Sequence, residues 1–251
     1  MEGITMEVCC YNLESAVYAK AAGADRIELC ANRYQGGTTP SYGMLEVVRQ
    51  NVNLPIFAMI RPRGGDFLYS KEELEVMFHD IQMAKELKME GVVMGVLRKN
   101  GQVDIEVMER LVEVARPMEV TFHRAFDLTP DPMKSLKDIM SLSVDRILTS
   151  GHRSSAFEGV EVIRSLVEMS QGKLSVMPGA GISEENLAQI LEQTGAKEFH
   201  VSAFGSRPSK MQFHKDLVQM GSGGSEYSID IADEARIRTF RGIVDQFTIK
   251  D

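Results

Sequence analysis

Two short apolar stretches each carry a glutamate two residues before a cysteine, as Glu7-Val8-Cys9 and Glu28-Leu29-Cys30. Side chains alternate along a β-strand, so each glutamate would share a face with its cysteine. If Glu7 is aligned with Glu28 on neighbouring parallel strands, the two thiols are also neighbours. Facing thiolates are soft ligands that select Cu(I), which makes Cys9 and Cys30 candidate metal ligands. The alternative is that both are free cysteines that pack as small apolar side chains.

A second group of residues has the types needed for acid/base chemistry. Arg61 and His123 lie where apolar stretches end, and Glu28 lies near the end of another. A carboxylate or imidazole could move protons while the guanidinium holds an anionic group, so Glu28, Arg61 and His123 are catalytic candidates. The alternative is that buried charges neutralise one another, with Arg61, His123 and Arg124 as the available cations. We favour this structural role for Glu7, which lies deeper.

A glycine-containing loop indicates an anion site. The segment Gly179-Ala180-Gly181-Ile182 leads into a helix that we expect Ser183 to cap. Backbone amides and a helix N-terminus attract anions, and barrels often bind phosphate between the loops after strands seven and eight. Ser202, at the end of the last stretch, could complete the site. We therefore expect anion binding at Gly179, Gly181, Ser183 and Ser202, assisted by Arg61.

The elements that must position these residues recur regularly. Eight apolar stretches start 20 to 35 residues apart, and helical patterns fill the intervals between them. Each interval is long enough for a right-handed crossover, which predicts an α/β fold with a single (β/α)8 TIM-type barrel over residues 1–251. A doubly wound open sheet is the runner-up, but no Gly-x-Gly-x-x-Gly follows the first stretch. The stretches are residues 6–11, 26–30, 56–61, 91–96, 118–123, 145–150, 174–177 and 198–202.

One segment falls outside this regular alternation. Residues 203–228 contain Arg207-Pro208 and the run Gly221-Ser222-Gly223-Gly224, with little periodicity. Because the segment follows the eighth stretch, we expect a long loop over the C-terminal face of the barrel, either a lid or a plain surface loop. Residues 229–247 have helical periodicity and are expected to form the final helix.

The composition excludes several classes of protein. The chain has 251 residues, a formal net charge of -8, 43% hydrophobic and 25% charged residues, which is typical of a soluble globular protein. The acidic excess argues against nucleic acid or an anionic membrane as partner. No apolar stretch is long enough to cross a bilayer, and the first residues do not form a signal peptide. Three cysteines, two of them adjacent, favour reduced thiols and a cytoplasmic location.

Six blocks of sequence together resemble the CutC copper homeostasis family, in order and at compatible spacing, between Met6 and Phe204. The resemblance implies a cytoplasmic TIM-type barrel, often oligomeric, that is linked with copper tolerance and binds Cu(I). It therefore strengthens the assignment of Cys9 and Cys30 as copper ligands, and it implies a homo-oligomer. It does not account for Arg61, His123 or the Gly179 loop. The blocks are residues 7–11, 23–30, 61–67, 121–127, 148–151 and 179–181.

Two functions remain open at this point. The first is a CutC-like copper homeostasis protein whose partner is a copper ion, bound as Cu(I) by Cys9 and Cys30. The second is a TIM-barrel enzyme that acts on a small anionic or phosphorylated metabolite by acid/base chemistry. No lysine on the inner face of the eight stretches could form a Schiff base, which disfavours that type of aldolase. Methionines are scattered and do not form a copper motif.

Overall fold

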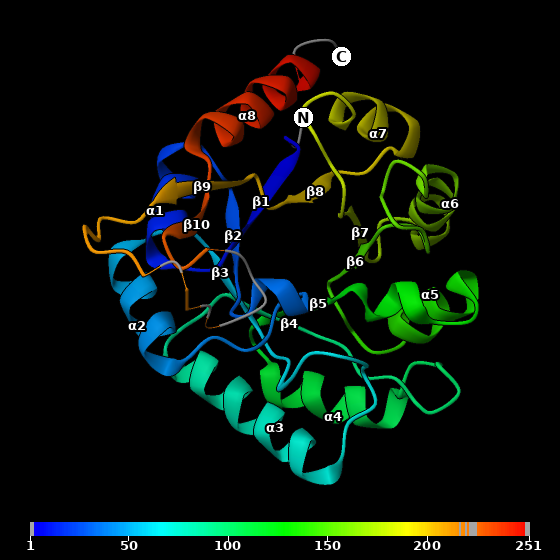
Figure 1. The fold of residues 1–251 in the computed structure, drawn as a ribbon. Helices are drawn as coiled ribbons and strands as arrows, with labels where there is room; N and C mark the ends of the chain where they lie inside the picture. The colour runs from blue at the N-terminus through cyan, green and yellow to red at the C-terminus, as the bar shows by residue number, and fades with distance from the viewer. Residues whose placement is uncertain (1–2, 216, 219, 221–224, 249–251) are drawn as a thin grey trace.

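Eight parallel strands form the centre of the computed structural model, which describes residues 3–215, 217–218, 220 and 225–248 (Figure 1). Their hydrogen-bonded order is β7-β6-β5-β4-β3-β2-β1-β8. A parallel bridge between Gly179 and His200 joins the two ends of this order, β7 and β8. The strands are β1 (Thr5–Cys10), β2 (Arg26–Leu29), β3 (Ile56–Met59), β4 (Gly91–Met94), β5 (Glu119–Phe122), β6 (Arg146–Thr149), β7 (Ser175–Pro178) and β8 (Glu198–Val201).

Helices surround the ring of strands on the outside (Figure 1). This alternation of strand and helix confirms the predicted (β/α)8 barrel. No helix in the described residues is both long and apolar enough to span a bilayer. The helices are α1 (Leu13–Ala21), α2 (Tyr42–Asn51), α3 (Lys71–Glu86), α4 (Ile105–Ala115), α5 (Pro132–Met140), α6 (Val160–Ser170), α7 (Leu187–Thr194) and α8 (Glu234–Thr248), with the 3-10 turns η1 (Arg33–Gln35) and η2 (Arg124–Leu128).

Local sequence signals explain where the helices begin and which face they bury. The Ser70 side chain accepts a hydrogen bond from the backbone N–H of Glu73, and the Glu73 carboxylate accepts one from the N–H of Ser70. This capping box satisfies two amides that have no partner within the helix. Helix α3 then buries Met77, Ile81 and Ala84, which recur at helical spacing on one face. The same periodicity made these elements predictable from sequence.

The strands turn alternate residues inward, as strand geometry requires. Val8 and Cys10 belong to the large apolar cluster between strands and helices, whereas Cys9 and Cys30 belong to a small inner cluster. The expected register between β1 and β2 is wrong, however. Cys9 is paired with Glu28, and Glu7 is paired with Arg26. Strand β2 is therefore shifted by two residues from the predicted alignment, in which Glu7 faced Glu28. Closing eight strands into a barrel staggers neighbouring strands, and parity alone does not reveal this stagger.

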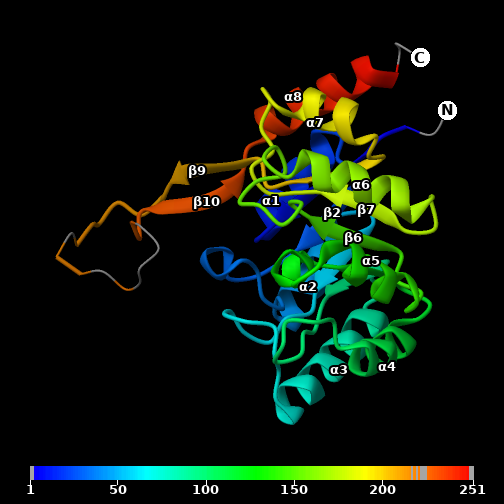
Figure 2. The ribbon, with the colours of Figure 1, turned by 90° about the vertical axis from the view of Figure 1, so that its right-hand side faces the viewer.

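The ends of the predicted long loop over residues 203–228 are more regular than expected. This region begins with strand β9 (Phe204–Pro208), which pairs antiparallel with β10 (Ser228–Ala232). The final helix therefore starts at Glu234, not at residue 229. Residues 216, 219 and 221–224 lie outside the described part of the chain. The hairpin projects away from the barrel on the side of the loops that follow β2 and β3 (Figure 2).

Contacts with distant residues hold the two hairpin strands in place. The Asn12 side chain donates to the carbonyl of Asp230, and the N–H of Ala232 donates to the hydroxyl of Ser15. The guanidinium of Arg33 lies 3.3 Å from the centre of the Phe204 ring. Because these partners are up to 218 residues away in sequence, the local pattern did not predict the hairpin.

Candidate functional site

A cavity of about 430 Å³ lies at the carboxyl ends of the barrel strands. This is the end at which barrel enzymes carry their chemistry, and the volume is in the range of sites for small molecules. Most of the candidates predicted from sequence share this cavity, including the three that we expected to act together. The residues used below that line it are Cys9, Glu28, Arg61, His123, Arg124, Gly181, His200 and Ser202.

The two predicted thiols lie together at the inner end of the cavity. The sulfur atoms of Cys9 and Cys30 are 3.9 Å apart, and Cys30 Sγ is 3.3 Å from Glu28 Oε2. Cys9 lines the cavity, whereas Cys30 is almost fully buried beneath Gly37, where an added Cβ would lie 3.2 Å from the Cys30 sulfur. The ligand atoms of Cys9, Glu28 and Cys30 all lie within 4.8 Å of one another, so one metal ion could contact all three.

The protons in this cluster are unequally held. The hydrogen bond between Cys9 and Cys30, helped by His200, lowers the pKa of the Cys9 thiol although burial opposes this. Burial raises the pKa of Cys30, and the bond to Cys9 adds to the effect. Burial, together with the negative charge of Cys9, raises the pKa of Glu28. Cys9 is therefore the more acidic thiol of the pair, and Cys30 and Glu28 hold their protons more tightly than an ordinary cysteine and glutamate do.

His200 connects this cluster to a second buried carboxylate. Its Nδ1 lies 2.7 Å from Glu7 Oε1, and its Nε2 lies 3.8 Å from Glu28 Oε2. Burial opposes the charging of His200, but its bonds to Cys9 and Glu7, together with the negative charge of Glu7, outweigh it and raise the pKa of the imidazole. His200 is therefore a cation placed between two acidic groups.

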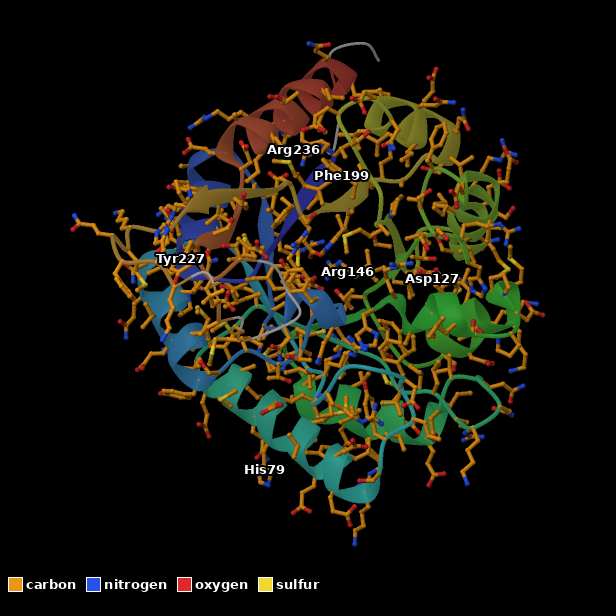
Figure 3. The ribbon with its side chains drawn as sticks, viewed as in Figure 1. His79, Asp127, Arg146, Phe199, Tyr227 and Arg236 are labelled. Carbon is orange, nitrogen blue, oxygen red and sulfur yellow. The ribbon has the colours of Figure 1, made fainter. Side chains whose placement is uncertain are left out.

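A belt of ion pairs crosses the barrel below the cavity. Arg26 Nε donates to Glu7 Oε2 at 2.5 Å, and Arg26 Nη2 donates to Glu198 Oε2 at the same distance. Arg146 also contacts Glu198 and appears inside the ring of strands in Figure 3. Burial opposes ionisation of Glu7, but the charge of Arg26 and the contacts of His200 lower its pKa to about 2. This arrangement supports the structural role favoured for Glu7.

Arg61 is buried without a carboxylate partner among the described residues. Its Nη1 donates to the carbonyls of Gln35 and Gly37, and its Nη2 donates to that of Gly65. Its Nε has no partner among the described residues. Backbone carbonyls and the Phe67 ring thus hold the guanidinium, and no ion pair within the described residues compensates its positive charge.

His123 is a neutral hydrogen-bond donor whose tautomer is fixed by the backbone. Its Nδ1 accepts from the N–H of Ala125, so the neutral ring carries its proton on Nε2. Burial and the charge of Arg61 lower the pKa of His123 to about 3, which keeps the ring neutral at physiological pH. The Nε2 atom is buried and has no partner in the described part of the chain. The Phe67 ring contacts both groups, at 4.8 Å from the His123 ring and 4.7 Å from the Arg61 guanidinium carbon.

The predicted anion loop is only partly in the cavity. Gly181 and Ser202 line the cavity, whereas Gly179 and Ser183 are not among its lining residues. Helix α7 begins at Leu187, and Ser183 does not cap it. Instead the Ser183 N–H donates to the Asn186 side chain. The expectation of a Ser183-capped helix is therefore wrong, because an extra turn separates the loop from the helix N-terminus.

Comparison with known proteins gives a direct assignment. Residues 4–205 match the CutC family over most of the barrel. The chain belongs to the CutC family. This CutC family member is 50% identical over 243 residues to the copper homeostasis protein cutC homolog of Homo sapiens, covering 96% of this chain and 89% of that protein. It is 44% identical over 238 residues to a CutC family protein of Parabacteroides distasonis, covering 94% and 98%.

Solved structures agree with this assignment. The putative copper homeostasis protein CutC of Streptococcus agalactiae matches with a TM-score of 0.76 and 36% identity, covering 79% of this CutC chain and 98% of that one. A phosphoribosyl anthranilate isomerase from Thermotoga maritima matches with a TM-score of 0.60 and 12% identity, covering 97% and 99%. At that identity the second match shows the barrel fold alone.

The sequence analysis of this CutC chain missed several residues of the site. Arg26 and Arg146 neutralise the inner carboxylates Glu7 and Glu198, and the sequence pattern does not single them out, although Arg26 lies on the same strand face as Glu28. Asp127 was also missed. It pairs with Arg124 and accepts hydrogen bonds from the backbone and side chain of Ser150. Its position within a short 3-10 turn gave no periodic signal.

Proposed function

We propose that this CutC family member binds Cu(I) through the thiolates of Cys9 and Cys30. The observation that carries the proposal is the 3.9 Å separation of the two sulfur atoms at the inner end of the cavity. Metal–thiolate bonds are about 2.3 Å long, so one ion can bridge sulfurs at this separation. Soft thiolates favour Cu(I) over hard cations, and the names of the human and streptococcal relatives refer to copper homeostasis.

The surroundings of the two sulfurs support Cu(I) rather than a hard cation. Met59, Phe57 and Val93 complete an apolar cluster around Cys9 and Cys30. Among the described residues, only Glu28 joins these two sulfurs in a candidate metal-ligand cluster, with its carboxyl oxygen within 4.8 Å of both. Burial raises the pKa of this carboxyl and so favours its protonated form. A protonated carboxyl is a poor ligand. Copper binding then displaces the proton of Cys30, so affinity should rise with pH.

Competition against a Cu(I) chelator under anaerobic conditions tests this proposal. We expect wild-type protein to retain one Cu(I), and Cys9→Ser and Cys30→Ser each to weaken binding at least about tenfold, as even changes around metal ligands do. Cys10→Ser is the matched control, because Cys10 is equally buried but faces the helices. Equal copper retention in all four proteins would remove Cys9 and Cys30 as ligands.

We also propose a cytoplasmic location and self-association. The location is supported by three free, buried cysteines, since reduced thiols are typical of that compartment. Self-association is supported by exposed apolar side chains on the projecting β9–β10 hairpin, among them Met211, Phe213 and Leu217. Exposed apolar patches commonly mark contacts between protein chains.

A further inference from the structure

The copper ligands occupy only the inner end of the cavity, which leaves most of its volume unexplained. One ion bridging two sulfurs needs a small fraction of about 430 Å³. The remaining wall carries Arg61, His123 and Arg124 on one side and Gly181 and Ser202 on the other. A cavity of this size with a few converging polar groups is typical of a site for a small organic molecule.

Two of these side chains have hydrogen-bonding capacity that the described residues do not use. His123 is 3% exposed, and its protonated Nε2 has no acceptor there. Arg61 is 5% exposed, and its Nε is likewise without an acceptor. Leaving a buried donor unsatisfied is costly, and leaving a buried cation without a counter-charge is more so. Both residues line the same cavity, and both pack against the Phe67 ring that also lines it.

The rigid mounting of these groups indicates a preformed site. Three backbone carbonyls hold Arg61, and the Ala125 amide fixes the tautomer of His123. The Arg124 side chain is held by Asp127 and Ser150. Donors that are already oriented lose little freedom when a ligand binds. All three are donors and none is an acceptor, so they fit an oxyanion.

We propose that Arg61, His123 and Arg124 form a binding site for the carboxylate or phosphate group of a small metabolite, beside the two thiols and independent of copper. The anion would accept hydrogen bonds from His123 Nε2 and from Arg61, and the Gly181 and Ser202 wall would contact the rest of the molecule. This goes beyond copper binding, because it assigns an organic ligand to the outer part of the cavity. It keeps Arg61 from the sequence expectation, but places the anion beside His123 and Arg124 and not at the Gly179 loop and a helix N-terminus.

Isothermal titration calorimetry of the copper-free, reduced protein with inorganic phosphate and with succinate tests this site. We expect at least one probe to bind with a dissociation constant below about 10 mM, a weak affinity because the probe carries little more than the anionic group. Binding of phosphate alone indicates a phosphorylated ligand, and binding of succinate alone indicates a carboxylated one. If neither probe binds the folded protein, the proposal is wrong. Because no copper is present, this outcome is independent of whether Cys9 and Cys30 bind the metal.

Substitutions at His123 separate its donor from its structural role. In His123→Asn the side-chain oxygen can still accept from Ala125, but the donor at the Nε2 position is lost. In His123→Gln the longer amide can restore a donor there. We expect His123→Asn to weaken probe binding about tenfold or more, and His123→Gln to recover part of the loss. Unchanged affinity in His123→Asn would contradict the proposal.

The contribution of charge is tested at the rim of the cavity. Arg124→Gln should weaken probe binding severalfold. The control is Arg164→Gln, which makes the same change in net charge on the outer face of α6, where Arg164 pairs with Glu161, and should leave probe binding unchanged. Equal effects of the two substitutions would show that only overall charge matters, and would overturn the assignment of Arg124. Circular dichroism and thermal melting of each variant establish that it is folded.

Discussion

Cys9 and Cys30 bring their sulfur atoms to 3.9 Å although their backbones are not paired with each other. In the strand register Cys9 stands opposite Glu28, and Cys30 lies one strand over and two residues further along. The inner face of a staggered barrel allows such diagonal neighbours to meet. Glu28 shares the inner face with both cysteines and its carboxyl contacts Cys30, so one cluster contains two thiols and an acid.

The unequal protonation of the thiols predicts selective alkylation. We expect iodoacetamide at pH 7 to modify Cys9 at least about tenfold faster than Cys10 or Cys30 in the folded protein, because Cys9 has the lowered pKa and lines the cavity. Mass spectrometry of peptides after short exposure measures the three rates. Unfolded protein is the control, in which all three thiols should react alike. Faster modification of Cys10 in the folded state would contradict the inward orientation of Cys9.

Glu7 should be essential for stability. Glu7→Gln leaves Arg26 and His200 without a full counter-charge in the barrel, and breaking a buried ion pair costs about 3 kcal/mol or more of the free energy of unfolding. Urea denaturation measures the change. The control is Glu14→Gln, which removes a partly exposed ion pair with Arg207 and should cost less than about 1 kcal/mol. Similar losses in the two variants would show that the buried ion pairs of Glu7 contribute no more to stability than the partly exposed pair of Glu14 with Arg207.

His123 should make stability depend on pH in a defined window. Its folded-state pKa of about 3 lies below its ordinary value of 6.5, so below pH 6.5 protons bind preferentially to the unfolded chain. The free energy of unfolding should therefore fall as pH falls from 6.5 towards 3. The contribution of His123 amounts to about 2 kcal/mol between pH 8 and pH 5.

Comparison with His123→Gln isolates this effect. The variant lacks the titrating group, so its free energy of unfolding should fall about 2 kcal/mol less than that of wild type over the same range. Urea titrations at pH 8, 6.5 and 5 provide the values. The raised pKa of His200 acts in the opposite sense, since its stabilisation is complete below pH 6.5 and declines as pH rises above it. Parallel curves for wild type and variant would refute the assigned neutral state of His123.

The apolar hairpin should govern assembly. Phe213 is 72% exposed and Leu217 is 97% exposed, so their substitution cannot disturb a packed core. Phe213→Ser combined with Leu217→Ser should lower the molar mass measured by light scattering after size exclusion. The matched control is Leu128→Ser, an exposed leucine in η2. If the double variant has the same mass as wild type at micromolar concentration, the hairpin does not hold copies together.

The barrel, the inner and outer faces of its strands, and most of the candidate residues that line the cavity could be predicted from the amino-acid sequence. Strand alternation follows from backbone geometry, so the order of residues along each strand is enough to assign Cys9, Glu28, Arg61 and His123 to the interior. The copper hypothesis depended on that parity and on the resemblance to the CutC family. These are local or family-level properties, and they do not require the three-dimensional arrangement.

Only the tertiary structure decided which of these groups meet. Arg26 and Arg146, not Arg61, neutralise the inner carboxylates, because barrel closure brings β2 and β6 to the same level as β8. Arg61 instead donates to the carbonyls of Gln35 and Gly37 in the loop after β2 and to that of Gly65 in its own loop, which no strand pattern specifies. Stagger, loop closure and the pairing of β9 with β10 all depend on contacts between residues far apart in sequence. Such contacts decide charge pairing and unsatisfied donors, and with them the chemistry that the cavity can support.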